Sequence, residues 1–151
     1  GAHHSGEIGE DRDPETHLIP NILKSVLSNS ELTVFGDDYP THDGTCIRDY
    51  VHVVDLAQAH LLGLHYMNDV NGFSAFNLGS GNGFSVLEVI NCCNNIIGKE
   101  VNYKVKNKRK GDPAVLVADS SKAKNSLNWK PKFTNLEDII KSAWTWHKKD
   151  F

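Results

Sequence analysis

Residues 44–57, GTCIRDYVHVVDLA, join a strand-like run to the start of a helix. Within them, residues 48–53 carry the β-branched and aromatic side chains typical of a strand. Asp55 then stands where it can cap a helix that extends to about Tyr66. A strand pattern that changes to a helical pattern within a few residues is typical of α/β chains, so this stretch predicts an α/β fold.

The same alternation continues on both sides of this stretch. Residues 14–28 have apolar side chains at helical spacing, with Asp13 and Pro14 as the expected start of a helix. Ser85 and Glu88 form a capping-box pattern, which predicts a helix to about residue 97. The other expected elements are strands at residues 32–35, 75–78 and 101–105, and helices at residues 120–127 and after a second capping box at residues 134–137.

The composition is that of one soluble globular domain. The chain has 151 residues, of which 39% are hydrophobic and 23% charged, and its net charge is −3. This charge excludes a global field that recruits nucleic acid or an anionic membrane. No apolar run approaches the roughly 20 residues needed to span a bilayer. Cys46, Cys92 and Cys93 are too few and too poorly spaced for a disulfide framework, which favours a reducing cytoplasm.

The first ten residues, GAHHSGEIGE, contain neither an initiator methionine nor a helix or strand pattern. They are typical of a loop that continues from preceding residues. The sequence therefore predicts that the chain is a fragment of a longer protein.

Arg48 and Tyr50 are candidate binding residues because they share one face of the predicted strand. A guanidinium at the mouth of a strand can bind a phosphate through two hydrogen bonds. Tyr50 could add a hydroxyl or a ring face to the same ligand. An ion pair of Arg48 with Asp49 or Asp55 explains the spacing equally well.

Residues 109–112, Arg-Lys-Gly-Asp, gather cations, a glycine and an acid in one loop. Arg109 could hold a diphosphate, and Asp112 could accept hydrogen bonds from ribose hydroxyls. For four loop residues alone, a solvated turn is the favoured interpretation. Residues 79–83, GSGNG, could cradle a phosphate on amide groups. Their spacing does not fit a dinucleotide fingerprint, so a tight turn is favoured there too.

The sequence contains no motif for catalysis or for metal binding. It has no Tyr-x-x-x-Lys pair and no Gly-x-Ser-x-Gly. Its eight histidines lack the spacing of metal ligands. We therefore expect no catalytic residue, no cofactor-binding residue and no metal ligand in this chain.

Several longer strings are similar to UDP-glucose 4-epimerase, a family of extended short-chain dehydrogenases/reductases. They occur in the family's order, from the first residue almost to the last. The strings are residues 1–6 (GAHHSG), 32–41 (LTVFGDDYPT), 43–57 (DGTCIRDYVHVVDLA), 76–81 (FNLGSG), 111–114 (GDPA), 118–123 (ADSSKA) and 127–129 (LNW).

The resemblance implies that residues 1–151 are the small mixed α/β substrate-binding domain of such an enzyme, with the Rossmann domain absent. The missing amino-terminal domain would bind NAD and carry the catalytic Tyr-x-x-x-Lys pair. The fragment would bind the UDP part of UDP-glucose or UDP-galactose and would be inactive alone. The full-length protein would act in galactose metabolism in the cytoplasm and could form a homodimer.

The resemblance also gives roles to the candidate residues. Arg48 and Arg109 would bind the diphosphate of the substrate, and Tyr50 would lie beside it. Asp112 would hold the ribose hydroxyls.

Further contacts are implied for the two ends of the substrate. Thr33 and Phe35 would meet the uracil, largely through backbone groups. His17 and Leu18 would contact the phosphates, although the family often has Asn where His17 stands. Leu116 occupies the position that limits the 2-substituent of the sugar. Leu is intermediate in size, so it does not predict whether N-acetyl sugars are accepted.

Two alternatives remain open. The chain could be the same part of another NAD-dependent nucleotide-sugar epimerase or dehydratase, although the long string at residues 44–56 argues against it. It could also be a non-catalytic nucleotide-sugar-binding module, although the loop-like start argues against that.

Overall fold

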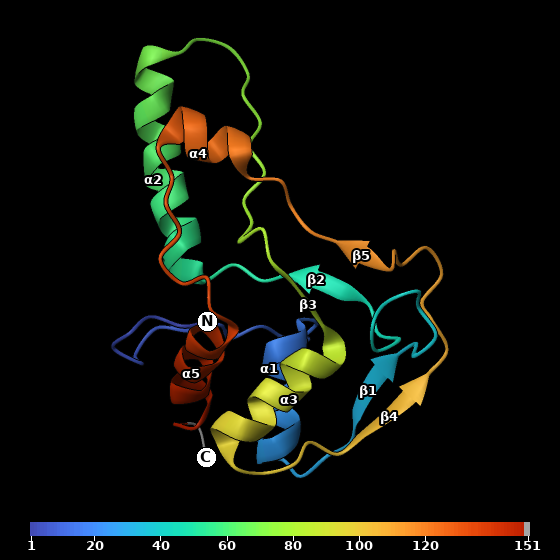
Figure 1. The fold of residues 1–151 in the computed structure, drawn as a ribbon. Coiled ribbons are helices and arrows are strands. Elements are labelled where there is room, and N and C mark those ends of the chain that lie inside the picture. Colours follow the sequence, from blue (N-terminus) through green and yellow to red (C-terminus); the bar gives the residue numbers. More distant parts are fainter. Residues whose placement is uncertain (150–151) are drawn as a thin grey trace.

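Helix α1 (Leu18–Leu27) lies in the larger hydrophobic core of the computed structural model, which describes residues 1–149. Helices α3 (Val86–Ile97) and α5 (Leu136–His147) pack against it. Burying one such Leu or Ile side chain contributes roughly 1.5–3 kcal/mol. We call these helices and strands β1 and β4 the body (Figure 1). The side chains at the centre of the core are Ile22, Leu23, Val89, Ile90, Ile139 and Ile140.

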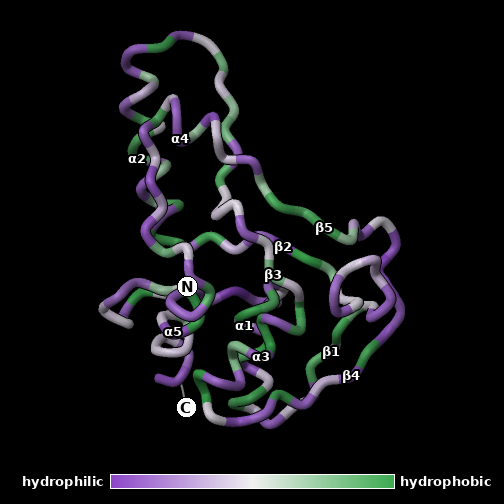
Figure 2. Tube along the Cα trace, viewed as in Figure 1, coloured by the Kyte–Doolittle hydropathy of each residue, from purple (hydrophilic) through white to green (hydrophobic). Residues whose placement is uncertain are grey.

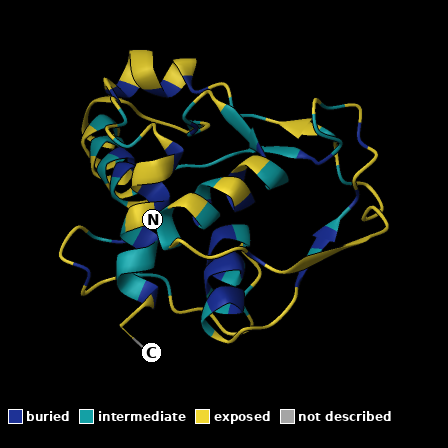
Figure 3. Ribbon diagram, turned by 60° about the horizontal axis from the view of Figure 1, so that its bottom comes forward, coloured by how far each residue is buried: buried dark blue, intermediate teal, exposed yellow. Residues whose placement is uncertain are grey.

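The strands are short and form two small sheets. In the first, β1 (Leu32–Phe35) pairs in parallel with β4 (Tyr103–Lys106). In the second, β2 (Ile47–Asp49) is central, antiparallel to β3 (Gly83–Ser85) and parallel to β5 (Val115–Leu116). Buried positions gather on α1, whereas β4 is exposed along its length (Figure 3). The fold is thus a small mixed α/β unit, as the sequence predicted.

A second region, which we call the arm, consists of α2 (Val53–Asp69), α4 (Ser121–Leu127) and the segments that follow them, residues 70–82 and 128–130 (Figure 1). Its small core contains Ala59, Ala123, Leu127 and Trp129. Apolar residues also occur along the segment that descends from the tip of the arm (Figure 2). Among the described residues, no helix is long and apolar enough to cross a membrane.

Two helix starts follow local signals, and one of them differs in position from the prediction. The capping box of α3 is confirmed, since Ser85 Oγ accepts from the Glu88 amide and the Glu88 carboxylate from the Ser85 amide. The predicted start of α1 at Pro14 is wrong, because α1 begins at Leu18. The Glu15 carboxylate accepts hydrogen bonds from the amides of residues 16 and 17, and His17 has an extended backbone, so the chain is not yet helical there.

The predicted cap of α2 is also wrong. The helix starts at Val53, and the His52 side chain accepts the Val54 amide proton. Asp55 is buried and accepts from the amides of Lys132 and Phe133, both at 2.9 Å. Asp55 therefore joins the arm to the chain segment that precedes α5.

Several other predicted elements form with changed bounds. The strand predicted at 48–53 is β2 and ends at Asp49, the one predicted at 101–105 is β4, and that at 32–35 is β1. The helix predicted at 120–127 is α4. Helix α5 starts within the second capping-box pattern, but Asn135 rather than Thr134 caps it.

The strand predicted at residues 75–78 is absent, which is a correction to the prediction. These residues carry no helix or strand assignment. Within the described part of the chain no strand pairs with them. A strand needs a partner for its backbone groups, so a favourable local sequence alone does not form one.

Candidate functional site

A cavity of about 450 Å³ lies between α1, β1, β2 and the loop that follows β4. It gathers residues that are distant in the sequence, from Thr16 to Asp112. Seven of the nine predicted binding residues line it: Leu18, Thr33, Phe35, Arg48, Tyr50, Arg109 and Asp112.

Strand β1 forms one wall of this cavity. Leu32 and Val34 are buried in the core of the body, so Thr33 and Phe35, which alternate with them, face the other way. The Arg109 guanidinium carbon lies 4.0 Å from the centroid of the Phe35 ring. This cation–π contact brings the loop after β4 onto the end of β1.

Strand β2 carries Arg48 at its middle position. Arg48 Nη2 lies 2.9 Å from Asp112 Oδ1, and Arg48 Nη1 donates to the Ile47 carbonyl at 2.7 Å. The ion pairs predicted as an alternative, with Asp49 or Asp55, do not form, because both carboxylates accept protons from backbone amides instead. Arg48 and Arg109 therefore bring two positive charges to one cavity.

Tyr50 and Cys46 are present in the cavity in their neutral forms. Burial raises the pKa of the Tyr50 hydroxyl well above its ordinary value. Burial also raises the pKa of the Cys46 thiol. Tyr50 therefore keeps its hydroxyl proton at neutral pH, and Cys46 is not an activated nucleophile.

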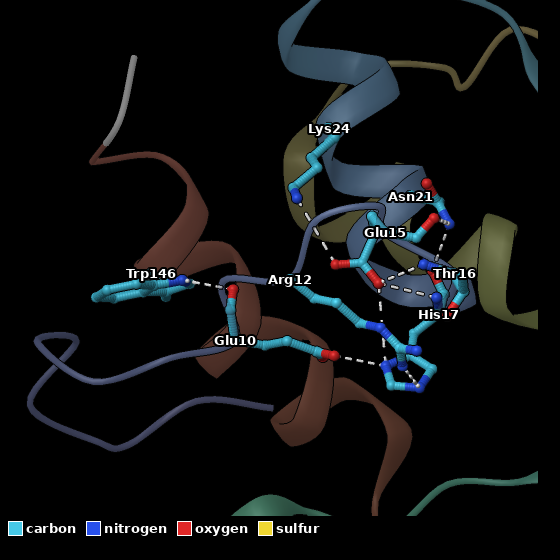
Figure 4. Close-up of polar contacts among 8 residues, drawn as sticks. All are labelled: Glu10, Arg12, Glu15, Thr16, His17, Asn21, Lys24 and Trp146. Carbon is cyan, nitrogen blue, oxygen red and sulfur yellow. Dashed lines mark hydrogen bonds and ion pairs between the residues drawn. The ribbon is translucent and has the colours of Figure 1, made fainter.

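His17 and Leu116, the other two predicted residues, are not among the residues that line the cavity. His17 is the residue before α1, and its Nδ1 lies 2.5 Å from Glu10 Oε1 (Figure 4). Leu116 is on β5, opposite Arg48 in the register, and its side chain is exposed.

The polar cluster around His17 resembles a metal site, because ligand atoms of Glu10, Glu15 and His17 lie within 4.8 Å of one another. Two cations already balance it: Lys24 Nζ is 3.6 Å from Glu15 Oε2, and Arg12 Nη1 is 3.4 Å from His17 Nε2 (Figure 4). Burial opposes ionisation of Glu15, but hydrogen bonds from backbone amides and the charge of Lys24 lower its pKa overall. The geometry is explained as a helix-start cluster without an ion.

The glycine-rich turn at residues 79–83 does not offer a phosphate cradle. The Asp49 carboxylate accepts from the Ser80 amide and hydroxyl at 3.0 and 2.6 Å, and from the amides of Gly81 and Ala118 at 3.4 and 3.2 Å. A Cβ at Gly79 would lie 2.3 Å from Asp49 Oδ2. The glycine thus allows the turn to close on a carboxylate, and the amides that a phosphate would need are taken.

Other residues of the cavity were not predicted as site residues. Cys46 shares the alternation of Arg48 and Tyr50, so the period of the strand could have indicated it. Asn21, Lys24 and Ser25 on α1, and Ser28 directly after it, line the cavity at helical spacing, which a search for a polar helix face could have found. Val86, the first residue of α3, has no comparable signal in the sequence.

Together, the fold and the cavity define a small mixed α/β unit in which two arginines line a cavity between a helix and two small sheets. Residues 2–143 match the family described as GDP-mannose 4,6 dehydratase. The chain therefore belongs to this family.

Individual relatives are similar to this chain over nearly its whole length. The chain is 52% identical to a UDP-glucose 4-epimerase of Lactobacillus helveticus over 149 residues, which is 98% of the chain and 45% of that relative. It is 49% identical to one of Lacticaseibacillus casei, again over 98% of the chain and 45% of the relative. The chain thus spans a little under half the length of these relatives.

Solved structures agree with this similarity. One UDP-glucose 4-epimerase structure has a TM-score of 0.93 at 49% identity and is matched over 99% of this chain and 46% of that chain. The Bifidobacterium longum enzyme in complex with NAD+ and UDP has a TM-score of 0.91 at 40% identity, over 99% of this chain and 45% of that one.

Proposed function

We propose that this chain is the UDP-binding part of a UDP-glucose 4-epimerase, an enzyme that interconverts UDP-glucose and UDP-galactose in galactose metabolism. The observation that carries the proposal is the meeting of Arg48 and Arg109 in one cavity beside Phe35 and Asp112. Two guanidiniums suit a diphosphate because each can form charge-assisted, bidentate hydrogen bonds to phosphate oxygens.

The other cavity residues fit the remaining parts of UDP. The neutral Tyr50 hydroxyl can donate to a phosphate oxygen, and Leu18, at the start of α1, also lines the cavity. The Asp112 carboxylate can accept from ribose hydroxyls when its pairing with Arg48 loosens. Thr33 and Phe35 present a strand backbone and an apolar ring, which suit the uracil.

The proposed roles of His17 and Leu116 concern residues outside the cavity lining. His17 would have to leave Glu10 before its ring could reach a phosphate. Leu116 would limit the sugar, which extends beyond the nucleotide and out of the cavity.

In this proposal the chain anchors the substrate and the other half of the enzyme performs the chemistry. The Arg48 and Arg109 contacts hold the diphosphate far from C4 of the sugar, so the sugar end is free to turn between two orientations. NAD supplies the hydride chemistry, and we assign it to the amino-terminal domain. Among residues 1–149 the best candidate for a dinucleotide cradle is the turn at 79–83, and its amides already bind Asp49. The chain by itself is therefore expected to be inactive.

The exposed apolar face of the arm is where the amino-terminal domain would pack. Leu61 and Leu64 are each 60% exposed, Met67 is 70% exposed and Phe73 is 93% exposed. Soluble monomers rarely leave such residues clustered in water. A homodimer and a cytoplasmic location of the full-length protein remain predictions of the family resemblance.

Titration with UDP, followed by nuclear magnetic resonance, tests the proposed site. We expect weak binding by the unsubstituted chain and at least about tenfold weaker binding by Arg48→Ala and Arg109→Ala, because each loses a charge-assisted contact. Lys124→Ala is the control, since it removes one exposed positive charge from α4, at the far end of the molecule (Figure 1). UDP binding that ignores both arginine substitutions would refute the site.

An activity assay tests whether this chain binds the substrate while the amino-terminal domain carries the catalytic groups. With NAD and UDP-galactose added, the chain is expected to show no epimerase turnover. Turnover by the chain alone would contradict the assignment of all catalytic groups to the amino-terminal domain.

A second candidate follows from the description of the family, which is that of a dehydratase acting on GDP-mannose. The same titration with GDP distinguishes the two. Tighter binding of GDP than of UDP would favour a related nucleotide-sugar dehydratase over the epimerase.

A further inference from the structure

Lys108 stands next to Arg109 in the loop after β4, and its side chain contacts residues 36–39. Lys108 Nζ donates to the Asp38 carbonyl at 3.0 Å and lies 3.1 Å from Asp38 Oδ1. The same ammonium lies 4.7 Å from the centroid of the Tyr39 ring. One side chain thus makes a hydrogen bond, an ion pair and a cation–π contact with a single turn.

The packing below this ammonium is tight. A Cβ at Gly36 would lie 2.7 Å from Lys108 Cγ and 2.7 Å from the Tyr39 ring. The Gly36 amide donates to the Lys106 carbonyl at 2.8 Å, which extends the pairing of β1 with β4 by one bond. The aliphatic part of the Lys108 side chain therefore packs on the backbone of Gly36, where the loop begins after β4.

Besides these contacts, the ion pair between Arg48 and Asp112 holds the far end of the loop. Residues 107–111 are exposed, and the internal hydrogen bond from the Asp112 amide to the Arg109 carbonyl is long, at 3.3 Å. Arg109 turns toward Phe35 while Lys108 turns toward Asp38 and Tyr39, so the two side chains hold the loop from two directions. An exposed loop with few contacts opens at low free-energy cost unless such anchors hold it.

We propose that Lys108 is a positioning residue of the nucleotide site: it fixes the loop so that Arg109 and Asp112 face the cavity, without contacting the ligand itself. The proposal rests on the proposed function for its ligand, a nucleoside diphosphate. In this proposal Lys108 acts by anchoring the loop and not by attracting the ligand through its positive charge. The nearby Lys106 distinguishes these two effects, because it carries the same charge without the anchoring contacts. Lys106 is exposed, and its side chain forms no hydrogen bond or ion pair within residues 1–149.

The experiment compares Lys108→Met, Lys108→Arg and Lys106→Met by titration with UDP. Lys108→Met should weaken UDP binding about five- to tenfold, since it loses the anchor but keeps the stem. Lys108→Arg keeps the donor and the cation–π contact and should stay within about twofold of the unsubstituted chain. Lys106→Met removes the same charge nearby and should also stay within about twofold, with the difference from Lys108→Met persisting in salt that screens charges.

Backbone order provides a readout that needs no ligand. Heteronuclear 15N relaxation should show faster motion of the amides of residues 107–112 in Lys108→Met and unchanged motion in Lys106→Met. Equal weakening by the two methionine variants, or loop amides that stay equally ordered, would overturn the positioning role. If the unsubstituted chain does not bind UDP, the proposed function fails, and the relaxation measurement still decides whether Lys108 positions the loop.

Discussion

The body and the arm differ in how far each covers its own apolar side chains. In the body, three helices bury a continuous core in which Ile22, Leu23 and Ile140 are fully inaccessible. The arm has a core of four residues and leaves Met67 and Phe73 in solvent. The candidate cavity is lined by α1 and β1 of the body together with β2 and the loop after β4, whereas the arm presents apolar side chains that the described residues leave exposed. None of the described residues that line the candidate site belongs to the arm.

The largest expected effect comes from the core of the body. Ile140→Ala should lower the free energy of unfolding by about 3–4 kcal/mol, because it leaves a cavity in close-packed surroundings. Leu61→Ala on the arm removes a side chain of similar size that is 60% exposed. This substitution should change the free energy of unfolding by no more than about 0.5 kcal/mol. Denaturant unfolding measures both, and equal losses would break the contrast between body and arm.

The next effect comes from the joint between the two regions. Asp55→Ala should lower the free energy of unfolding by about 2–3 kcal/mol, because the amides of Lys132 and Phe133 lose the buried carboxylate that accepts from both. Asp69→Ala, at the exposed end of the same helix, is the matched control. Hydrogen exchange should then show faster exchange of those two amides in Asp55→Ala only. If they stay protected, Asp55 does not join the arm to the body.

A smaller effect depends on pH and on His52, the cap of α2. Burial, with a contribution from the positive amino terminus, lowers the pKa of His52 below 6.5. Just below pH 6.5 the unfolded chain binds a proton that the folded chain excludes, so stability present above pH 6.5 is lost as the pH falls through this window. The melting temperature should therefore drop between about pH 7.5 and pH 5.5.

His52→Asn tests the origin of this drop, because Asn keeps a capping oxygen but does not titrate. The variant should lose less melting temperature over the same pH range. An identical drop in both proteins would assign the pH dependence to other groups.

Substitutions on the apolar face of the arm are expected to have the smallest effect on the free energy of unfolding. They should have a larger effect on self-association of the chain. Met67→Gln combined with Phe73→Ser should change the free energy of unfolding by no more than about 0.5 kcal/mol, since both side chains are already in solvent. The unsubstituted chain should self-associate as its concentration rises, and the double variant should not. Sedimentation velocity compares them. A chain that stays monomeric at high concentration would show that the exposed face is tolerated in water.

Local signals in the sequence predicted the elements that local interactions build. Ser85 and Glu88 close a capping box across three residues, and Gly98 ends the same helix with a positive φ of 75°. Both features need no partner outside the helix. The predictions failed where the partner is remote: Asp55 looked like a cap but binds amides 77 and 78 residues away. Residues 75–78 looked like a strand, but no neighbouring strand pairs with them among the described residues.

For the candidate site, too, the sequence predicted some features and the structure was needed for others. The family resemblance indicated Arg48, Tyr50, Arg109 and Asp112 by their positions, while spacing alone left the Arg48 alternatives equal and favoured a solvated turn for the loop of Arg109. The structure brings these residues together and also reveals Cys46 and Val86 in the lining. It decides, too, that Asp49 occupies the amides of the glycine-rich turn.

The sequence by itself determined the fold class, both ends of helix α3 and the residue types available for a diphosphate. Those properties depend on chain neighbours, which the sequence states directly. The tertiary structure alone decided that Arg48 pairs with Asp112, that Lys108 and Arg109 hold one loop from two directions, and that the arm remains uncovered. These contacts join residues about 64 to 74 positions apart, so they exist only when the core of the body fixes the distance between the segments that carry them.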